Sequence, residues 1–194
     1  MGVARSILVR MFGRPKGVLG RLGGLIMART NREYAVWVIE LLDVGPDENV
    51  LEVGFGPGVG IQLLAKRAPA GYVAGIDPSV EMVAQAAARN AEAIKRGRVD
   101  LRLGSAASLP FAHDTFDTAV AINSMQLWPD AEAGLREIGR VVRGSGRVAL
   151  GFTRYSGQPK SGVAEALTAA GFTNPRMVEQ SENFCALATS PSYS

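Results

Sequence analysis

The sequence predicts a single-domain α/β fold in which a doubly wound, mostly parallel sheet is completed by a C-terminal antiparallel hairpin strand. First, 194 residues of which 47% are hydrophobic suffice for one domain with a substantial core, but not for two ordinary domains. Second, short apolar runs alternate with segments of helical periodicity, which is typical of a parallel sheet covered on both faces. Third, residues 177–190 contain two β-like stretches around Ser181-Glu182-Asn183, the pattern of a terminal hairpin.

Each expected element has a local signal. The expected buried strands are the apolar runs at residues 49–53, 72–77, 99–103, 117–122 and 147–152. A first helix is expected to begin after Asn31 and to end before Gly45-Pro46, and further helices are expected at residues 60–68, 79–95, 130–142 and 162–170. Ser79 and Asp130 are suitable N-cap residues, and Gly171 is a suitable residue to end the last helix.

The N-terminal segment differs in charge from the rest of the chain. Residues 1–32 carry seven basic residues and no acidic one, whereas the remainder carries 14 basic and 18 acidic residues. Apolar residues at helical spacing, interrupted by Gly13-Arg14-Pro15, predict two short amphipathic helices here. We expect residues 1–30 to form a basic amphipathic arm, able to contact an anionic membrane surface, although a solvated arm would have the same composition.

Composition excludes several classes of protein. No run approaches the roughly 18 to 20 apolar residues of a membrane-spanning helix. Arg5 and Arg10 interrupt the opening apolar stretch, which makes it a poor signal peptide. Cys185 is the only cysteine, so no internal disulfide forms, and a cytoplasmic location is expected. No cluster of His, Cys and Asp has the spacing of a metal site.

The strongest functional signal is a glycine-rich turn after the first expected strand. Gly54, Gly56 and Gly58 follow the apolar strand, and Asp77 ends the next strand 19 residues beyond Gly58. Glycines let the backbone turn sharply beside a ligand, and an acid at this place can accept both hydroxyl hydrogens of a ribose. The sequence therefore predicts a nucleoside site at the carboxyl ends of these strands.

The residues in and around the turn limit the classes of ligand that the site can bind. Val59 stands where the dinucleotide fingerprint needs its third glycine, and no Lys-Ser/Thr pair follows to make a phosphate-binding loop. Glu52, at the end of the strand, suits a ligand that carries an ammonium or sulfonium group. A carboxylate that caps nearby backbone amides is the alternative for Glu52.

Several segments in order resemble class I S-adenosylmethionine-dependent methyltransferases, of the small-molecule type related to ubiquinone and menaquinone biosynthesis. LEVGFGPGVG resembles the first motif and AGIDPSVEMVAQAAARN the second. GSAASLPFAHDTFDTAVAINSMQLWPD and LREIGRVVRGSGRVAL resemble the segments that follow, and AAGFTNPRMVEQSENFCALAT resembles the closing hairpin. The resemblance covers residues 31–189 and implies a Rossmann-like fold and S-adenosyl-L-methionine as cofactor.

The resemblance also implies roles for particular residues. The glycine turn and Glu52 would line the methionine moiety, Asp77 would bind the ribose, and Pro78 or Met82 would pack on the adenine. Ser105 stands where the family usually has an aspartate that accepts a hydrogen bond from the adenine, and a hydroxyl accepts more weakly. The expected cofactor-binding residues are Glu52, Gly54, Gly56, Gly58, Asp77, Pro78, Met82, Ser105, Ala106, Asn123 and Ser124.

The expected reaction is methyl transfer to a small, apolar or amphiphilic acceptor, with residues 1–30 as the cover of the site and residues 31–194 as the cofactor-binding domain. Candidate acceptor-binding residues are Tyr34, Met125, Trp128 and Tyr155; packing of Met125 and Trp128 on the helix after Asp130 is the alternative for that pair. No catalytic base is assigned. His113 precedes the amino end of a strand, so it is expected to be an exposed turn residue, and Cys185 is expected in the core.

Two other functions remain open at the level of the sequence. One is a catalytically inactive cofactor-binding or membrane-docking protein of the same fold. The other is a nicotinamide-dependent oxidoreductase, which the missing third glycine disfavours. Methylation of nucleic acid is not expected, because Ile122-Asn123-Ser124-Met125 lacks the Asn/Asp-Pro-Pro-aromatic pattern of base-amine methyltransferases. The oligomeric state is not predicted.

Overall fold

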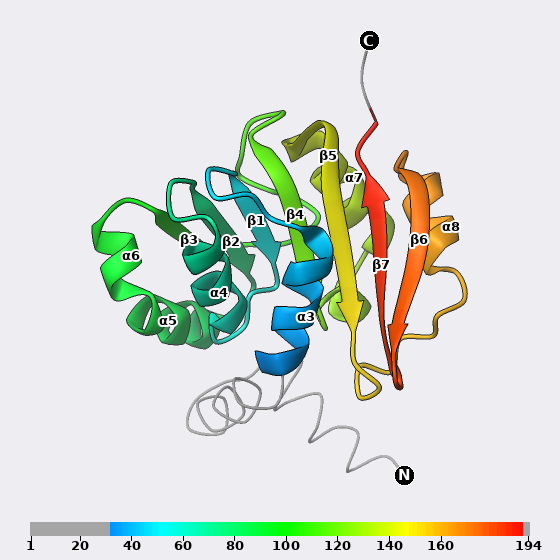
Figure 1. Ribbon diagram of the computed structural model, residues 1–194, viewed down its shortest axis with the longest axis horizontal. Helices are drawn as coiled ribbons and strands as arrows, with labels where there is room; N and C mark the ends of the chain where they lie inside the picture. The colour runs from blue at the N-terminus through cyan, green and yellow to red at the C-terminus, as the bar shows by residue number, and fades with distance from the viewer. Residues whose placement is uncertain (1–31, 192–194) are drawn as a thin grey trace.

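The computed structural model describes residues 32–191, and it contains one seven-stranded sheet with strand order β3-β2-β1-β4-β5-β7-β6 (Figure 1). The expected arm, residues 1–30, and Asn31, which is the expected N-cap of the first helix, lie outside the described residues. Strands β1 to β5 are parallel, and β7 runs antiparallel to both β5 and β6. The strands are β1 (Val50–Val53), β2 (Val73–Asp77), β3 (Val99–Leu103), β4 (Phe116–Ile122), β5 (Val142–Phe152), β6 (Thr173–Gln180) and β7 (Asn183–Thr189). The predicted fold class is confirmed.

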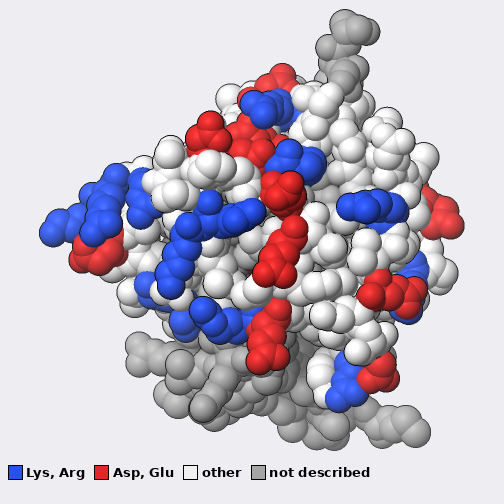
Figure 2. Space-filling model, viewed as in Figure 1, with Lys and Arg blue, Asp and Glu red and all other residues white. Residues whose placement is uncertain are grey.

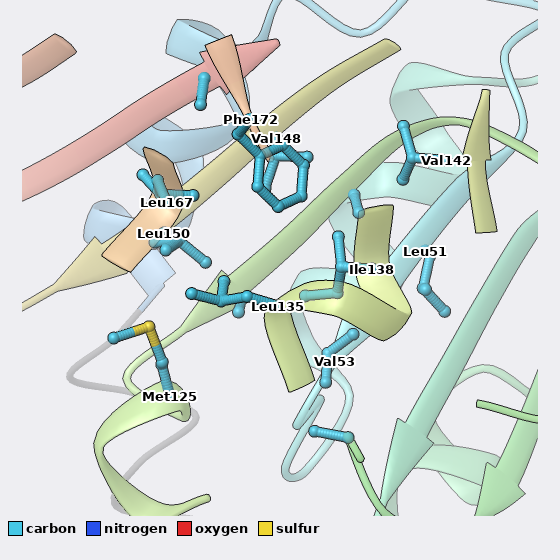
Figure 3. Packing of buried hydrophobic residues seen from close by; sticks show 14 of the residues in the cluster. Leu51, Val53, Met125, Leu135, Ile138, Val142, Val148, Leu150, Leu167 and Phe172 are labelled. Atoms are coloured by element: carbon cyan, nitrogen blue, oxygen red, sulfur yellow. The ribbon is translucent and has the colours of Figure 1, made fainter. Parts of the chain in front are cut away.

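Helices cover both faces of the sheet. The helices are α3 (Arg32–Leu42), α4 (Val59–Arg67), α5 (Val80–Arg89), α6 (Ala91–Lys95), α7 (Ala131–Val141) and α8 (Val163–Ala169), with a 3₁₀ turn, η2, at Met125–Leu127. Helices α3, α4 and α5 lie on one face, and α7 and α8 lie on the other (Figure 1). Leu135 and Ile138 of α7 belong to the same buried cluster as Leu51, Val53 and Leu150 of the sheet (Figure 3). None of the helices in residues 32–191 is long and apolar enough to span a bilayer.

One predicted helix is not continuous. The helix expected over residues 79–95 is divided at Asn90 into α5 and α6. The Asn90 side chain is buried, and its amide donates to the carbonyl oxygens of Gly58 at 3.1 Å and Ala86 at 2.9 Å. The backbone of Asn90, with φ −107° and ψ 17°, is not helical, and its side chain connects α5 to the glycine turn. The N-caps predicted at Ser79 and Asp130 are confirmed, since Ser79 accepts from the Met82 amide and Asp130 from the Ala133 amide.

A second difference concerns the strand expected at residues 147–152. β5 begins at Val142, directly after α7, and its first part crosses Ser145, which has a φ of 64°. The register between β4 and β5 shifts between Phe116 and Thr118. This irregular start contains Gly144 and Gly146, so the sequence resembles a turn there.

Arg147 of β5 links α3 to the sheet through hydrogen bonds. Its guanidinium donates to the carbonyl oxygen of Leu42, at the end of α3, at 3.0 Å, and to both carboxylate oxygens of Glu48 at 2.7 and 2.8 Å. We expect Arg147→Met to lower the free energy of unfolding by about 1–3 kcal/mol, because the poorly exposed Glu48 carboxylate loses its cation. Urea unfolding measures this loss.

Arg136→Met is the matched control. Arg136 pairs with Glu132 one turn away on α7, with both side chains more than half exposed. Such a pair contributes about 0.5 kcal/mol or less, so this variant should unfold nearly as the wild type does. Equal losses for the two variants would show that Arg147 has no special role in holding α3.

Candidate functional site

The glycine turn lies between the end of β4 and helix α5. Gly54 and Gly58 both have a φ of 79°, a left-handed conformation that favours glycine. A Cβ at Gly54 would lie 2.4 Å from the Cβ of Ser124, and one at Gly58 would lie 2.6 Å from the Cβ of Ala86. These positions therefore need glycine for space as well as for backbone conformation.

Asp77 closes the turn from the neighbouring strand. One carboxylate oxygen accepts from the Gly56 amide at 2.8 Å, and the other accepts from the Ser79 amide at 2.9 Å. Burial raises the pKa of Asp77, and the two amide hydrogen bonds oppose that rise. Because an ionised carboxylate has about four acceptor positions, it retains the capacity to accept two ribose hydroxyls.

The side chain of Glu52, a residue of β1, lies beneath the turn and beside the start of α4. It is 3% exposed, and its Oε2 has no hydrogen-bond partner among the described residues. A Cβ at Gly60 would lie 2.2 Å from Glu52 Oε1, so the helix needs a glycine there to admit the carboxyl group. Burial raises the pKa of Glu52 to about 8, with the nearby charge of Asp77 as a second cause and a hydrogen bond from the Ile61 amide opposing both.

Ser124 and Asn123 connect the end of β4 to its two neighbouring strands. The Ser124 hydroxyl donates to the Val53 carbonyl oxygen of β1 at 2.6 Å. The Asn123 side-chain oxygen accepts from the Thr153 amide at 2.8 Å and from its hydroxyl at 3.1 Å, just beyond β5. Asn123 has a φ of 50°, which is tolerated more readily by asparagine than by most residues.

A cavity of about 440 Å³ opens beyond Thr153. Its lining residues are Glu33, Tyr34, Thr153, Arg154, Tyr155, Gln180, Ser181, Glu182 and Asn183. The cavity therefore lies between the first turn of α3, the end of β5 and the β6–β7 turn.

On the face of the molecule that carries α3, acidic side chains form a row over this helix, and basic side chains gather over α4 to α6 (Figure 2).

Comparison with known proteins identifies the family. Residues 50–146 match the family model described as a methyltransferase domain. The chain belongs to this methyltransferase family. YdaC of Bacillus subtilis, an uncharacterised methyltransferase, is 33% identical over 129 residues, which are 66% of this chain and 69% of YdaC. The ubiquinone/menaquinone biosynthesis C-methyltransferase UbiE of Geotalea daltonii is 27% identical over 62% of this chain and 52% of UbiE.

A solved S-adenosylmethionine-dependent methyltransferase from Aquifex aeolicus has the same fold. It superposes with a TM-score of 0.73 at 20% identity, over 84% of this chain and 92% of that one. The chain spans about half the length of several curated relatives that it matches. The class I resemblance is confirmed, and the methyltransferase uses S-adenosylmethionine as its methyl donor. Family membership favours this enzyme class over the nicotinamide-dependent alternative.

The residues at the expected adenine position of the methyltransferase differ in exposure. Pro78 and Ser105 are exposed, whereas Ala106 is buried and Met82 is only 2% exposed. The Ser105 hydroxyl accepts from the Ala107 amide at 3.3 Å.

Two exposed apolar residues lie beside Asp77 and belong to none of the candidate residues that the sequence predicts. Val80 is 64% exposed at the start of α5, and Leu103, which pairs with Asp77 in the sheet, is 55% exposed. Large apolar side chains with this much exposure are candidates to contact a ligand. Only their positions mark them in the sequence. Val80 follows the Ser79 N-cap, and Leu103 lies at the carboxyl end of a strand.

The candidate acceptor residues of the methyltransferase fall into two groups. Tyr34 and Tyr155 line the cavity, and Tyr34 is buried with its hydroxyl donating to the Phe184 carbonyl oxygen at 2.6 Å. Tyr155 is 81% exposed, with the Arg154 guanidinium 4.6 Å from its ring centre. Tyr34 therefore supplies a ring to the wall, while its hydroxyl holds α3 against β7.

Met125 and Trp128 pack elsewhere. Met125, the first residue of η2, is buried in the core cluster (Figure 3), and a Cβ at Gly134 of α7 would lie 2.6 Å from the Trp128 ring. Both side chains therefore take part in the packing that was the alternative expectation for this pair. His113 lies exposed in a turn and Cys185 is fully buried, as expected. Within residues 32–191, no three His, Cys, Asp or Glu side chains are grouped closely enough to hold a metal ion.

Proposed function

We propose that this methyltransferase transfers the methyl group of S-adenosylmethionine to a small, apolar or amphiphilic acceptor bound in the cavity beside Thr153. The observation that carries the proposal is a continuous path of contacts from the cavity to the glycine turn. Thr153 lines the cavity and bonds to Asn123, and the next residue, Ser124, packs against Gly54. An acceptor in the cavity would therefore lie beside the methionine end of the cofactor.

The residues around the turn fit the adenosyl group. In the proposal Asp77 accepts the ribose hydroxyls, Val80 and Leu103 pack with Pro78 around the adenine, and the unpartnered oxygen of Glu52 faces the methionine end. Ser105 with Ala106 borders the adenine, and Asn123 with Ser124 borders the methionine end. Met82 supports this wall from the core. The cofactor supplies an activated methyl group, so the protein has to align the acceptor and exclude water.

The lining of the cavity supports an amphiphilic acceptor. The rings of Tyr34 and Tyr155 offer apolar surface, while Thr153 and the ion pair of Arg154 with Glu182 offer polar groups. Glu33 adds a carboxylate at the first turn of α3. We propose that the apolar part of the acceptor contacts the rings and that its polar group lies at this rim.

Residues 1–30 are proposed as the cover of the cavity, and residues 31–194 as the cofactor-binding domain. Glu33 and Tyr34 line the cavity, so the chain enters α3 at the cavity's edge. The apolar residues of the arm would then face the acceptor. Contact of the arm with an anionic membrane stays a prediction.

Deleting residues 1–28 is expected to leave cofactor binding intact and to abolish turnover, because α3 and the glycine turn are retained while the proposed cover is lost. Calorimetry with S-adenosylhomocysteine measures the first quantity. Transfer of a labelled methyl group to hydroquinones or to aminophospholipids in mixed micelles measures the second. Turnover that is unchanged by the deletion would contradict the cover, and full-length protein that labels neither class would contradict the proposed acceptor.

A further inference from the structure

Glu52 is a buried acid without a counter-charge. No ion pair within residues 32–191 includes it, and its Oε2 accepts no hydrogen bond from the described residues. The side chain projects toward the start of α4, where Gly60 leaves room for it and the Ile61 amide donates to it. A buried carboxylate in such surroundings is costly, and the usual response of a protein is to keep the group protonated.

The charged groups on the elements around Glu52 leave its protonated form favoured. β2 contributes Asp77, which is also an acid and disfavours a second negative charge. The acid of β4, Asp117, lies at the opposite end of its strand and is paired with Arg143. The cations of α4 are Lys66 and Arg67, in its last turn, and both are exposed. Burial, followed by the charge of Asp77, raises the pKa of Glu52 to about 8.

The proposed placement of the cofactor would bring positive charge to this acid. S-adenosylmethionine carries an α-ammonium and a sulfonium, whereas the product S-adenosylhomocysteine carries the ammonium but a neutral thioether sulfur. We propose that Glu52 is protonated in the cofactor-free protein, loses this proton to solvent when S-adenosylmethionine binds, and thereby distinguishes substrate from product by charge. This inference rests on the proposed cofactor site.

Methyl transfer changes the positive charge that faces Glu52. During transfer the sulfur–methyl bond breaks and its electron pair stays on sulfur, while an electron pair of the acceptor forms the new bond to the methyl carbon. The positive charge passes to the acceptor, which releases a proton to solvent when its reacting atom carries one. Glu52 then faces one positive charge fewer and takes a proton back from solvent. The ionised form of Glu52 thus favours the substrate, while its protonated form removes an attraction that would hold the product.

Calorimetric titration of the full chain at pH 6.5 tests the proposal, with phosphate and imidazole as buffers of different ionisation enthalpy. An α-amino group is still protonated at this pH, so the cofactor itself contributes little to proton exchange. We expect release of about one proton per S-adenosylmethionine bound, and clearly less per S-adenosylhomocysteine. The affinity for S-adenosylmethionine should rise by up to about tenfold per pH unit between pH 5.5 and 6.5, more steeply than that for the product.

Glu52→Gln should abolish the proton release, whereas Glu40→Gln, on the exposed face of α3, should preserve it. Equal binding enthalpies of the wild type in the two buffers would overturn the proposal, as would undiminished proton release by Glu52→Gln. The wild-type comparison decides the matter even if the variant does not fold. Failure of the wild type to bind S-adenosylmethionine at all would instead contradict the proposed function.

Discussion

Asp77→Ala is expected to weaken S-adenosylmethionine binding by about 100-fold or more, with the protein still folded. Two charge-assisted hydrogen bonds to the ribose would be lost, and together they contribute about 3 kcal/mol or more. The variant also removes the acceptor for the Gly56 amide, which holds the glycine turn against the end of β2. Calorimetry with S-adenosylmethionine and S-adenosylhomocysteine measures the loss, and the thermal unfolding curve confirms that the fold persists.

Asp100→Asn is the matched control for this variant. Asp100 lies on the neighbouring strand β3, where it pairs with Arg102 and accepts from the Tyr72 hydroxyl, away from the glycine turn. Its replacement should leave cofactor affinity unchanged within about twofold, since surface ion pairs contribute little. If Asp77→Ala binds S-adenosylmethionine as tightly as Asp100→Asn does, the adenosyl group does not lie where we place it.

Local sequence patterns were sufficient to predict the strands and helix starts that depend on neighbouring residues alone. The alternation of apolar runs and helical segments predicted the five parallel strands, and the side chains of Ser79 and Asp130 predicted two helix starts. The spacing between Gly58 and Asp77 predicted that an acid would reach the turn, because one helix and one strand separate them. The hydrogen bond from Gly56 to Asp77 shows this proximity directly.

The features that the sequence did not predict depend on contacts between distant segments. Asn90 breaks the helix expected over residues 79–95, and its side chain bonds to Gly58, which lies 32 residues earlier. Met82 fits the helical pattern equally well as a core residue or as a ligand contact, and only the packing of α5 buries it. Val80 and Leu103 look like ordinary core residues in the sequence, and their exposure beside Asp77 appears only in three dimensions.

Glu52→Gln is expected to stabilise the cofactor-free protein, by an amount that grows from pH 5 to pH 8. The pKa of Glu52 is about 8 in the folded protein and close to its usual 4.5 in the unfolded chain. Between these values the folded protein binds one more proton than the unfolded chain, so the free energy of unfolding falls as the pH rises. The slope is about 1.4 kcal/mol per pH unit at most, and several kcal/mol over the whole interval is an upper bound.

Glutamine removes this pH dependence because it is neutral at every pH and nearly identical in shape. Its side-chain oxygen can still accept from the Ile61 amide, and its NH₂ group occupies the place of the oxygen that has no partner. Urea unfolding at pH 5 and pH 8 measures the effect: the wild type should lose stability between these pH values relative to Glu52→Gln. Glu40→Gln, which alters an exposed carboxylate, should follow the wild type.

Parallel pH profiles of the wild type and Glu52→Gln would mean that burial of Glu52 has no energetic cost. If the profiles diverge, the wild type keeps a destabilising acid beneath the glycine turn, and a role of that acid in cofactor binding accounts for its presence there.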